Sequence, residues 1–153
     1  MAPPAFNHQK LVGELYSEIH DYIRKKGGKC EAFTAPFMVR LNENDETFVA
    51  PDISVICDPE KLNEKGCIGA PDWIIEVVSP SDPGHDYVHK LNLYIKAGVR
   101  EYWIVDPSSQ MVTVYLQGED RMAPATYTFD DSVKADIYED LTIDFAEIKE
   151  QLK

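Results

Sequence analysis

Apolar residues recur at helical spacing in two segments of the chain. Between about His8 and Lys26 they fall three or four positions apart, as on one face of an amphipathic helix: Leu11, Leu15, Ile19, Tyr22 and Ile23. We expect Asn7 to cap the start of this helix and Gly27-Gly28 to end it. A second helix is expected from Asp82, as its N-cap with Pro83 in the first turn, to Ala97-Gly98.

Between and after these helices the pattern is typical of strands, with extended apolar runs bounded by turn residues. The expected strands are Phe33–Leu41, Phe48–Cys57, the nearly continuous apolar run Pro71–Pro80, Glu101–Pro107, Met111–Leu116 and short strands within Tyr127–Ile137. A short helix is expected over Phe145–Leu152. This order predicts an α/β fold with a mixed central sheet flanked by helices. The length of 153 residues predicts one domain, 1–153.

The charge balance limits the class of partner. There are 27 acidic and 15 basic residues, a formal net charge of −12, which argues against broad coating of nucleic acid but not against a local cationic cleft. No apolar run is long enough to span a membrane, and the first residues lack the pattern of a signal peptide. We therefore expect a cytoplasmic protein with no membrane partner.

The cysteines are odd in number and have no metal-binding spacing. Cys30, Cys57 and Cys67 form no Cys-x-x-Cys pair, so neither a disulfide framework nor a zinc site is predicted. We expect reduced thiols that pack as small apolar groups.

Acidic residues inside apolar strands suggest a site. Burying Glu76 unpaired would cost several kcal/mol. Alternation along its strand places Asp72, Ile74, Glu76 and Val78 on one face and Trp73, Ile75 and Val77 on the other. Asp52 opens the neighbouring expected strand, and two such carboxylates can hold a hard divalent cation, with the Val77 carbonyl as a third ligand. A purely structural ion pair of Glu76 is the alternative.

The following helix offers a cation for this site. At about 100° per residue, Lys90 is the polar residue nearest the apolar arc of that helix, so it leans toward the sheet. Asp86 lies one turn earlier and can orient the ammonium group. In the competing interpretation, Asp86 and Lys90 form an ordinary surface pair.

Two carboxylates, a lysine and a divalent metal are suited to phosphodiester hydrolysis. Pro51-Asp52, Glu76-Val-Val and Asp86-x-x-x-Lys90 resemble the PD-(D/E)XK nucleases with the lysine moved to the next helix. Three further segments resemble the Uma-type family of putative restriction endonucleases, a domain of unknown function: Ala70-Pro-Asp-Trp-Ile-Ile-Glu-Val-Val-Ser-Pro-Ser, Lys90-x-x-x-Tyr94 and Gly98-Val-Arg-Glu-Tyr-Trp-Ile-Val-Asp-Pro107.

The resemblance implies a restriction-endonuclease-like fold and a nuclease acting on DNA with Mg²⁺ or Mn²⁺. Asp52, Glu76 and the Val77 carbonyl would hold the metal, and Lys90 would be the catalytic cation. It also suggests that His8 and Glu18 approach the site from the first helix, although a core-facing histidine is more often structural. A nuclease that cuts both strands needs two sites, so a homodimer is expected.

Some features favour a different function. Val78 stands where the common motif has its lysine. Longer relatives carry an acidic segment before the first helix, whereas this sequence starts almost at that helix. The runner-up is therefore a weak or inactive nuclease-fold binding or regulatory module. Acyl hydrolysis is a poor third, since no Gly-x-Ser-x-Gly motif is present. Tyr115, Tyr127 and Tyr138 are interface candidates that sheet packing explains equally well.

Overall fold

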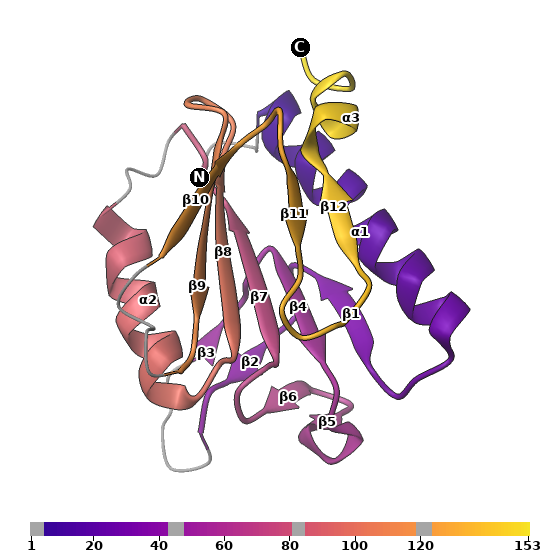
Figure 1. Cartoon of the computed structure of the whole chain (residues 1–153). Helices are drawn as coiled ribbons and strands as arrows, with labels where there is room; N and C mark the ends of the chain where they lie inside the picture. Colours follow the sequence, from indigo (N-terminus) through magenta and orange to yellow (C-terminus); the bar gives the residue numbers. More distant parts are fainter. Residues whose placement is uncertain (1–4, 43–47, 81–84, 119–123) are drawn as a thin grey trace.

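A mixed β-sheet with helices on both faces forms the body of the molecule (Figure 1). The computed structural model describes residues 5–42, 48–80, 85–118 and 124–153. Among these, six strands form the main sheet, in the spatial order β1 (Glu31–Thr34), β4 (Ile53–Ile56), β7 (Trp73–Val77), β8 (Glu101–Asp106), β9 (Met111–Leu116) and β10 (Ala125–Thr128). β7 and β8 are parallel and the other neighbours are antiparallel, so the predicted mixed sheet is confirmed.

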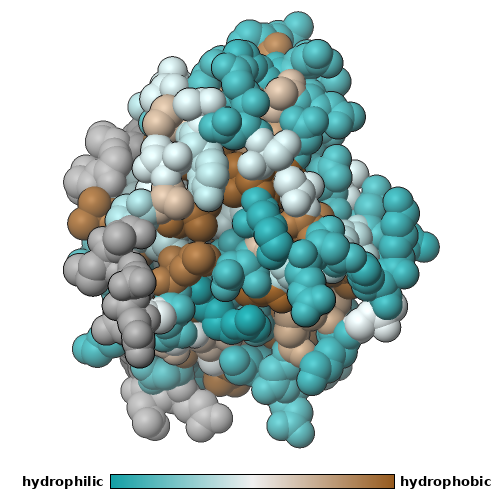
Figure 2. Space-filling view, in the orientation of Figure 1, coloured by the Kyte–Doolittle hydropathy of each residue, from teal (hydrophilic) through white to brown (hydrophobic). Residues whose placement is uncertain are grey.

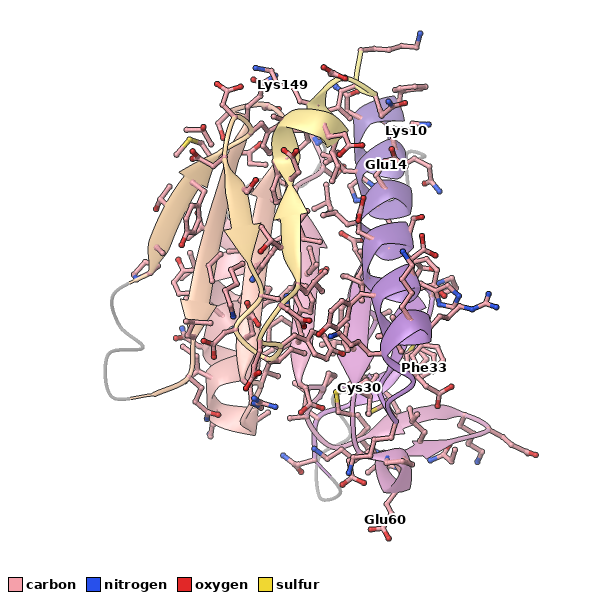
Figure 3. All side chains as sticks on the ribbon, turned by 45° about the vertical axis from the view of Figure 1, so that its right-hand side comes forward. Lys10, Glu14, Cys30, Phe33, Glu60 and Lys149 are labelled. Carbon is pink, nitrogen blue, oxygen red and sulfur yellow. A yellow bond between two sulfur atoms is a disulfide. The ribbon has the colours of Figure 1, made fainter. Side chains whose placement is uncertain are left out.

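Smaller elements complete the fold. A second sheet has the order β3 (Phe48–Val49), β2 (Val39–Arg40), β6 (Gly66–Ile68) and β5 (Leu62–Asn63), and β11 (Ser132–Lys134) pairs with β12 (Thr142–Asp144). The helices are α1 (Phe6–Lys26), α2 (His85–Ala97), α3 (Phe145–Lys149) and the 3-10 helix η1 (Pro59–Lys61). In Figure 3, Glu60 of η1 and Lys149 of α3 lie at opposite ends of the molecule.

The two faces of the main sheet bury separate apolar clusters. On one face, Trp73 and Ile75 of β7 pack with Leu11 and Leu15 of α1, together with the β11–β12 pair and α3. On the other face, Ile74 packs with Tyr94 of α2 and with the second sheet. The alternation of side chains predicted for this strand is therefore confirmed.

The first helix starts earlier than expected. α1 begins at Phe6 with Ala5 at the N-cap, so the prediction that Asn7 caps the helix is wrong. The Asn7 side chain instead exchanges two hydrogen bonds with the backbone of Lys153, at 2.9 and 3.1 Å. The predicted end is confirmed, because Gly27 adopts a left-handed conformation at φ 69° and closes the helix.

Two of the expected strands are each divided. The segment 33–41 contributes to β1 and β2, which belong to different sheets, and Pro36 lies between them. The segment 48–57 is likewise divided into β3 and β4 around Pro51. Proline lacks the N–H that a ladder hydrogen bond needs, which explains both interruptions. The short strands β5, β6 and β12 were not predicted.

One glycine is required by a close backbone approach. Gly66 in β6 has φ 137°, and a Cβ built there would lie 2.1 Å from the carbonyl oxygen of Met38. Any larger residue would force β6 away from the chain before β2. The start of the second predicted helix cannot be compared, since Asp82 and Pro83 lie outside the described residues.

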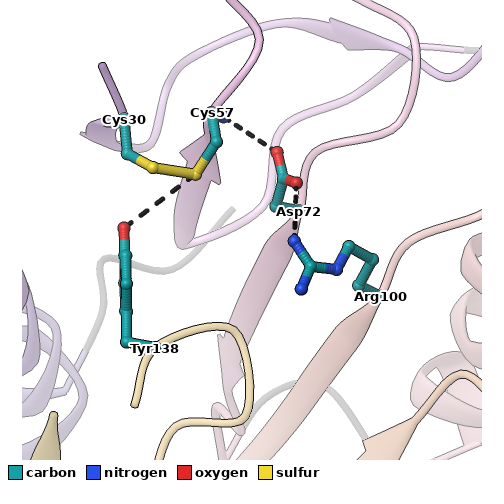
Figure 4. The surroundings of a disulfide bond; sticks show 5 residues. All are labelled: Cys30, Cys57, Asp72, Arg100 and Tyr138. Carbon is teal, nitrogen blue, oxygen red and sulfur yellow. Dashed lines mark hydrogen bonds and ion pairs between the residues drawn. A yellow bond between two sulfur atoms is a disulfide. The ribbon is translucent and has the colours of Figure 1, made fainter. Parts of the chain in front are cut away.

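A disulfide joins Cys30 and Cys57, so the prediction of reduced thiols is wrong for this pair (Figure 4). In the antiparallel register of β1 and β4, Glu31 faces Ile56. The next pair in that register is Cys30 and Cys57, which therefore lie opposite each other. Sequence spacing alone does not show this pairing, because it depends on strand register. Cys67 remains a buried thiol, and burial raises its pKa to about 11.

Hydrophilic residues cover most of the face shown in Figure 2, as the charged composition predicts. Within the described residues, no helix combines the length and the apolar character needed to cross a membrane. The three tyrosines considered as interface candidates are each partly buried against the apolar clusters, Tyr127 and Tyr138 on one face and Tyr115 on the other. Packing on the sheet therefore explains their presence.

Candidate active site

The register of two central strands brings the acidic residues together. Ile53 of β4 faces Ile75 of β7 in an antiparallel pair. The next two residues in that register, Asp52 and Glu76, therefore lie beside each other. Both residues lie where β4 begins and β7 ends. Adjacent strands thus deliver two carboxylates to one end of the sheet, as the sequence predicted.

Each carboxylate is held by the backbone beside the other. The Asp52 amide donates to Glu76 Oε1 at 3.0 Å, and the Val77 amide donates to Asp52 Oδ2 at 2.8 Å. These side-chain contacts take the place of ladder hydrogen bonds at the point where the strands separate. The positions of both acids are therefore fixed by backbone structure and not by side-chain packing alone.

Lys90 reaches this pair from α2. Its Nζ lies 3.0 Å from Glu76 Oε2, and its side chain is 27% exposed while that of Glu76 is 4% exposed. The prediction that Lys90 leans toward the sheet is confirmed. The side chain of Asp86, which was expected to orient Lys90, lies outside the described residues.

Two tyrosines of α2 also contact the site, and sequence reasoning missed them. The Tyr94 hydroxyl donates to Glu76 Oε2 at 3.2 Å, and the Tyr87 hydroxyl donates to the Val77 carbonyl oxygen at 3.4 Å. Both rings belong to the apolar arc of α2, and Tyr94 also to the Lys90-x-x-x-Tyr94 motif, but neither hydroxyl was predicted to reach the site. Their spacing from Lys90, three positions before and four after, was the available signal.

The first helix supplies one of the two residues expected from it. His8, in the first turns of α1, places Nε2 3.3 Å from Asp52 Oδ2. Glu18 is exposed; partial burial raises its pKa, and the charges that act on it belong to other residues of α1 and to Glu147. Ten residues separate it from His8, about 15 Å along a helix, so the structure does not bring Glu18 to the site.

Burial and charge shift two of the site's protonation equilibria. Burial raises the pKa of Glu76, and the nearby Asp52 carboxylate adds to the rise while Lys90 opposes it. The hydrogen bond to Asp52 raises the pKa of His8, against the effect of burial. Each carboxylate therefore lies against a group that can carry positive charge, Glu76 against Lys90 and Asp52 against His8.

The donor set available to a cation consists of oxygen atoms. Histidine, cysteine and acidic side chains in the described part of the chain form no group of three that could hold a metal ion. The Asp52 and Glu76 carboxylates and the Val77 carbonyl are hard ligands of the kind that Mg²⁺ and Mn²⁺ accept. Mg²⁺ commonly uses one or two protein carboxylates and completes its shell with water and phosphate. The residues present fit such an ion.

Comparisons with known proteins agree with the predicted resemblance. Residues 1–146 match the family model described as Uma2, putative restriction endonuclease. The chain is 30% identical to the uncharacterized protein slr1290 of Synechocystis, over 74% of this chain and 67% of that protein.

The fold is also similar to a solved structure. The crystal structure of a putative nuclease belonging to DUF820, from Anabaena variabilis, superposes with a TM-score of 0.76. The match covers 96% of this chain and 84% of that one, at 24% identity, and so demonstrates a shared fold. Since the family model spans nearly the whole sequence, this chain belongs to the Uma2 family of putative restriction endonucleases.

Proposed function

We propose that this protein is a divalent-metal-dependent endonuclease that hydrolyses phosphodiester bonds of DNA. The observation that carries the proposal is the convergence of Asp52, Glu76 and Lys90 from β4, β7 and α2 at one end of the sheet. A structural ion pair between Glu76 and Lys90 would not need a second carboxylate beside it. Two acids held side by side repel each other unless a cation lies between them, which supports a cation-binding role.

In this proposal Asp52, Glu76 and the Val77 carbonyl hold Mg²⁺ or Mn²⁺. The ion would polarise a phosphoryl oxygen and lower the pKa of bound water. Val77 is held on both sides, since its amide donates to Asp52 and its carbonyl accepts from Tyr87. The backbone ligand is therefore positioned by the same contacts that position the carboxylates.

Lys90 acts on the phosphate or on the attacking water. Its ammonium group lies at the buried carboxylate but is still partly exposed, so it can donate a hydrogen bond to a substrate oxygen while staying near Glu76. A cation at this point stabilises negative charge that develops on the phosphate. It takes the place of the lysine that the common motif carries two positions after the glutamate, where this chain has Val78.

His8 supports Asp52 in this arrangement. Its side chain is 12% exposed, and its Nε2 approaches the same Asp52 oxygen that accepts the Val77 amide. We assign His8 the role of orienting Asp52 from α1. Both helices that flank the sheet then contribute a group to the site.

DNA is proposed as the substrate because the family is described as restriction endonucleases. The net charge of −12 makes nonspecific binding to a polyanion unfavourable, so affinity would depend on the metal ion and on Lys90. We further propose that two copies act together on duplex DNA, since the described residues of one chain offer one such site. Sedimentation of the protein alone and on a short duplex measures this directly.

The function is tested by cleavage assays on plasmid and single-stranded DNA with Mg²⁺ or Mn²⁺. We expect activity in the natural sequence and loss of at least a hundredfold in Asp52→Asn, Glu76→Gln and Lys90→Gln. Glu18→Gln, a change of an exposed residue on α1, serves as the control and keeps its activity. Metal binding without cleavage of any nucleic acid would contradict nucleic acid as the substrate, and no metal binding at all would favour the binding or regulatory module.

A further inference from the structure

Lys90 is flanked on α2 by two tyrosines that also contact the proposed site. Tyr87 precedes it by three residues and Tyr94 follows it by four, so all three side chains lie on one side of the helix. The Lys90 ammonium also lies 5.5 Å from the centre of the Tyr87 ring. Successive turns of one helix thus present a hydroxyl, an ammonium group and a second hydroxyl to the end of β7.

Tyr94 and Lys90 share one oxygen of Glu76. The Tyr94 hydroxyl lies 3.2 Å and the Lys90 Nζ 3.0 Å from Oε2, while Oε1 accepts the backbone amide of Asp52. Both oxygens of the carboxylate therefore have donors, and the plane of the group is defined. Without the hydroxyl, the long and partly exposed Lys90 side chain would be the remaining donor to Oε2 among the described residues.

The ring of Tyr94 does not by itself explain the hydroxyl. Tyr94 is fully buried, and its ring packs edge-on against that of Tyr102 at 4.9 Å in the cluster beneath α2. Phenylalanine would fill the same space and make the same ring contact. A buried hydroxyl is worth keeping where it has a partner, and here the partner is a proposed metal ligand.

We infer that Tyr94 is a positioning residue, whose hydroxyl orients Glu76 for the metal and for its ion pair with Lys90. The inference rests on the proposed function and adds a residue to that site. Groups that hydrogen-bond to a metal ligand fix its orientation, and their loss typically weakens metal affinity or activity about 10- to 100-fold. Tyr87 has the corresponding, weaker contact with the Val77 carbonyl.

The test compares Tyr94→Phe with Tyr102→Phe. The two changes remove the same atom from neighbouring rings of one buried cluster, but only Tyr94 donates to Glu76. Mn²⁺ affinity is measured by calorimetry, and kcat and KM for plasmid DNA are measured separately at several Mn²⁺ concentrations. Thermal unfolding with and without Mn²⁺ reports whether each variant folds and how far the metal stabilises it.

We expect Tyr94→Phe to bind Mn²⁺ at least tenfold more weakly, to show a smaller stabilisation by Mn²⁺, and to keep its KM for DNA. Raising the Mn²⁺ concentration should recover part of its activity, and Tyr102→Phe should behave like the natural sequence. Equal Mn²⁺ affinity and equal kcat in Tyr94→Phe and Tyr102→Phe would overturn the inference alone. Absence of both Mn²⁺ binding and cleavage in the natural sequence would overturn it together with the proposed function.

Discussion

Lys90 of α2 and Glu76 of β7 form an ion pair, with Nζ 3.0 Å from Oε2, at the end of the central sheet where β7 ends. The pair joins a helix to a strand on the face of the sheet opposite α1. It therefore contributes to the stability of the fold as well as to the proposed chemistry, and the two contributions can be measured separately.

Lys90→Gln should lower the stability of the metal-free protein. Removing the ammonium leaves the buried Glu76 carboxylate with less compensation, which we expect to cost about 1–2 kcal/mol because Lys90 is partly exposed. Urea unfolding in a chelating buffer measures the change. Lys96→Gln, an exposed lysine on the same helix, is the matched control and should change stability by less than about 0.5 kcal/mol. Equal effects of the two substitutions would contradict the ion pair.

Glu76→Gln should stabilise the metal-free protein at neutral pH while it removes metal binding. Burial raises the pKa of Glu76, so the folded state retains a proton that the unfolded state has already lost. The free energy of unfolding of the natural sequence should therefore fall as pH rises from about 4.5 through the raised pKa.

This fall should be smaller in Glu76→Gln, which has no proton to lose at position 76, while Glu101 still contributes because burial also raises its pKa. Denaturant unfolding between pH 4 and 8 in a chelating buffer gives the comparison, with Glu31→Gln as an exposed control on β1. If Glu76→Gln were less stable than the natural sequence throughout this range, the Glu76–Lys90 ion pair would stabilise the fold by more than burial of the Glu76 carboxylate costs.

Glu101→Ala should be strongly destabilising for a reason unrelated to the site. The Glu101 carboxylate is 1% exposed and accepts the amides of Asp136 and Ile137 and the Trp103 indole N–H at 2.7–3.1 Å. Removing it leaves these donors unsatisfied, at a cost of about 3 kcal/mol. Urea unfolding should show this loss in Glu101→Ala but not in Glu150→Ala, an exposed position at the end of α3.

Reduction of the Cys30–Cys57 disulfide should lower the free energy of unfolding. The bond closes a segment with a sequence separation of 27, for which chain entropy predicts about 3.5 kcal/mol. Urea unfolding with and without dithiothreitol measures the difference, and the double variant Cys30→Ser/Cys57→Ser should not respond to the reductant. Three titratable thiols in the unfolded, unreduced protein would show that the bond is absent.

Local periodicity explains which features could be predicted from sequence. Alternation over five residues assigned Trp73 and Glu76 to opposite faces, and helical geometry turned Lys90 toward the sheet. Both inferences depend on neighbours a few positions apart. The convergence of Asp52 with Glu76 also followed, because consecutive extended segments commonly pair.

Features that depend on register or on an amphipathic side chain could not be predicted in the same way. Cys30 and Cys57 meet only because β1 and β4 pair in one particular register. Tyr94 has an apolar ring and a polar hydroxyl, so it fits the apolar face of the helix whether or not that hydroxyl has a hydrogen-bond partner. The resemblance alone predicted Glu18 near the site, but Glu18 lies about 15 Å along α1 from His8.

Calorimetric titration of Mn²⁺ into the natural sequence, Asp52→Asn and Lys90→Gln tests the central claim most directly. Binding should be present in the natural sequence, lost in Asp52→Asn, and retained or strengthened in Lys90→Gln, where a competing positive charge is gone. Unchanged binding in Asp52→Asn, or no binding in the natural sequence, would contradict a metal site between β4 and β7.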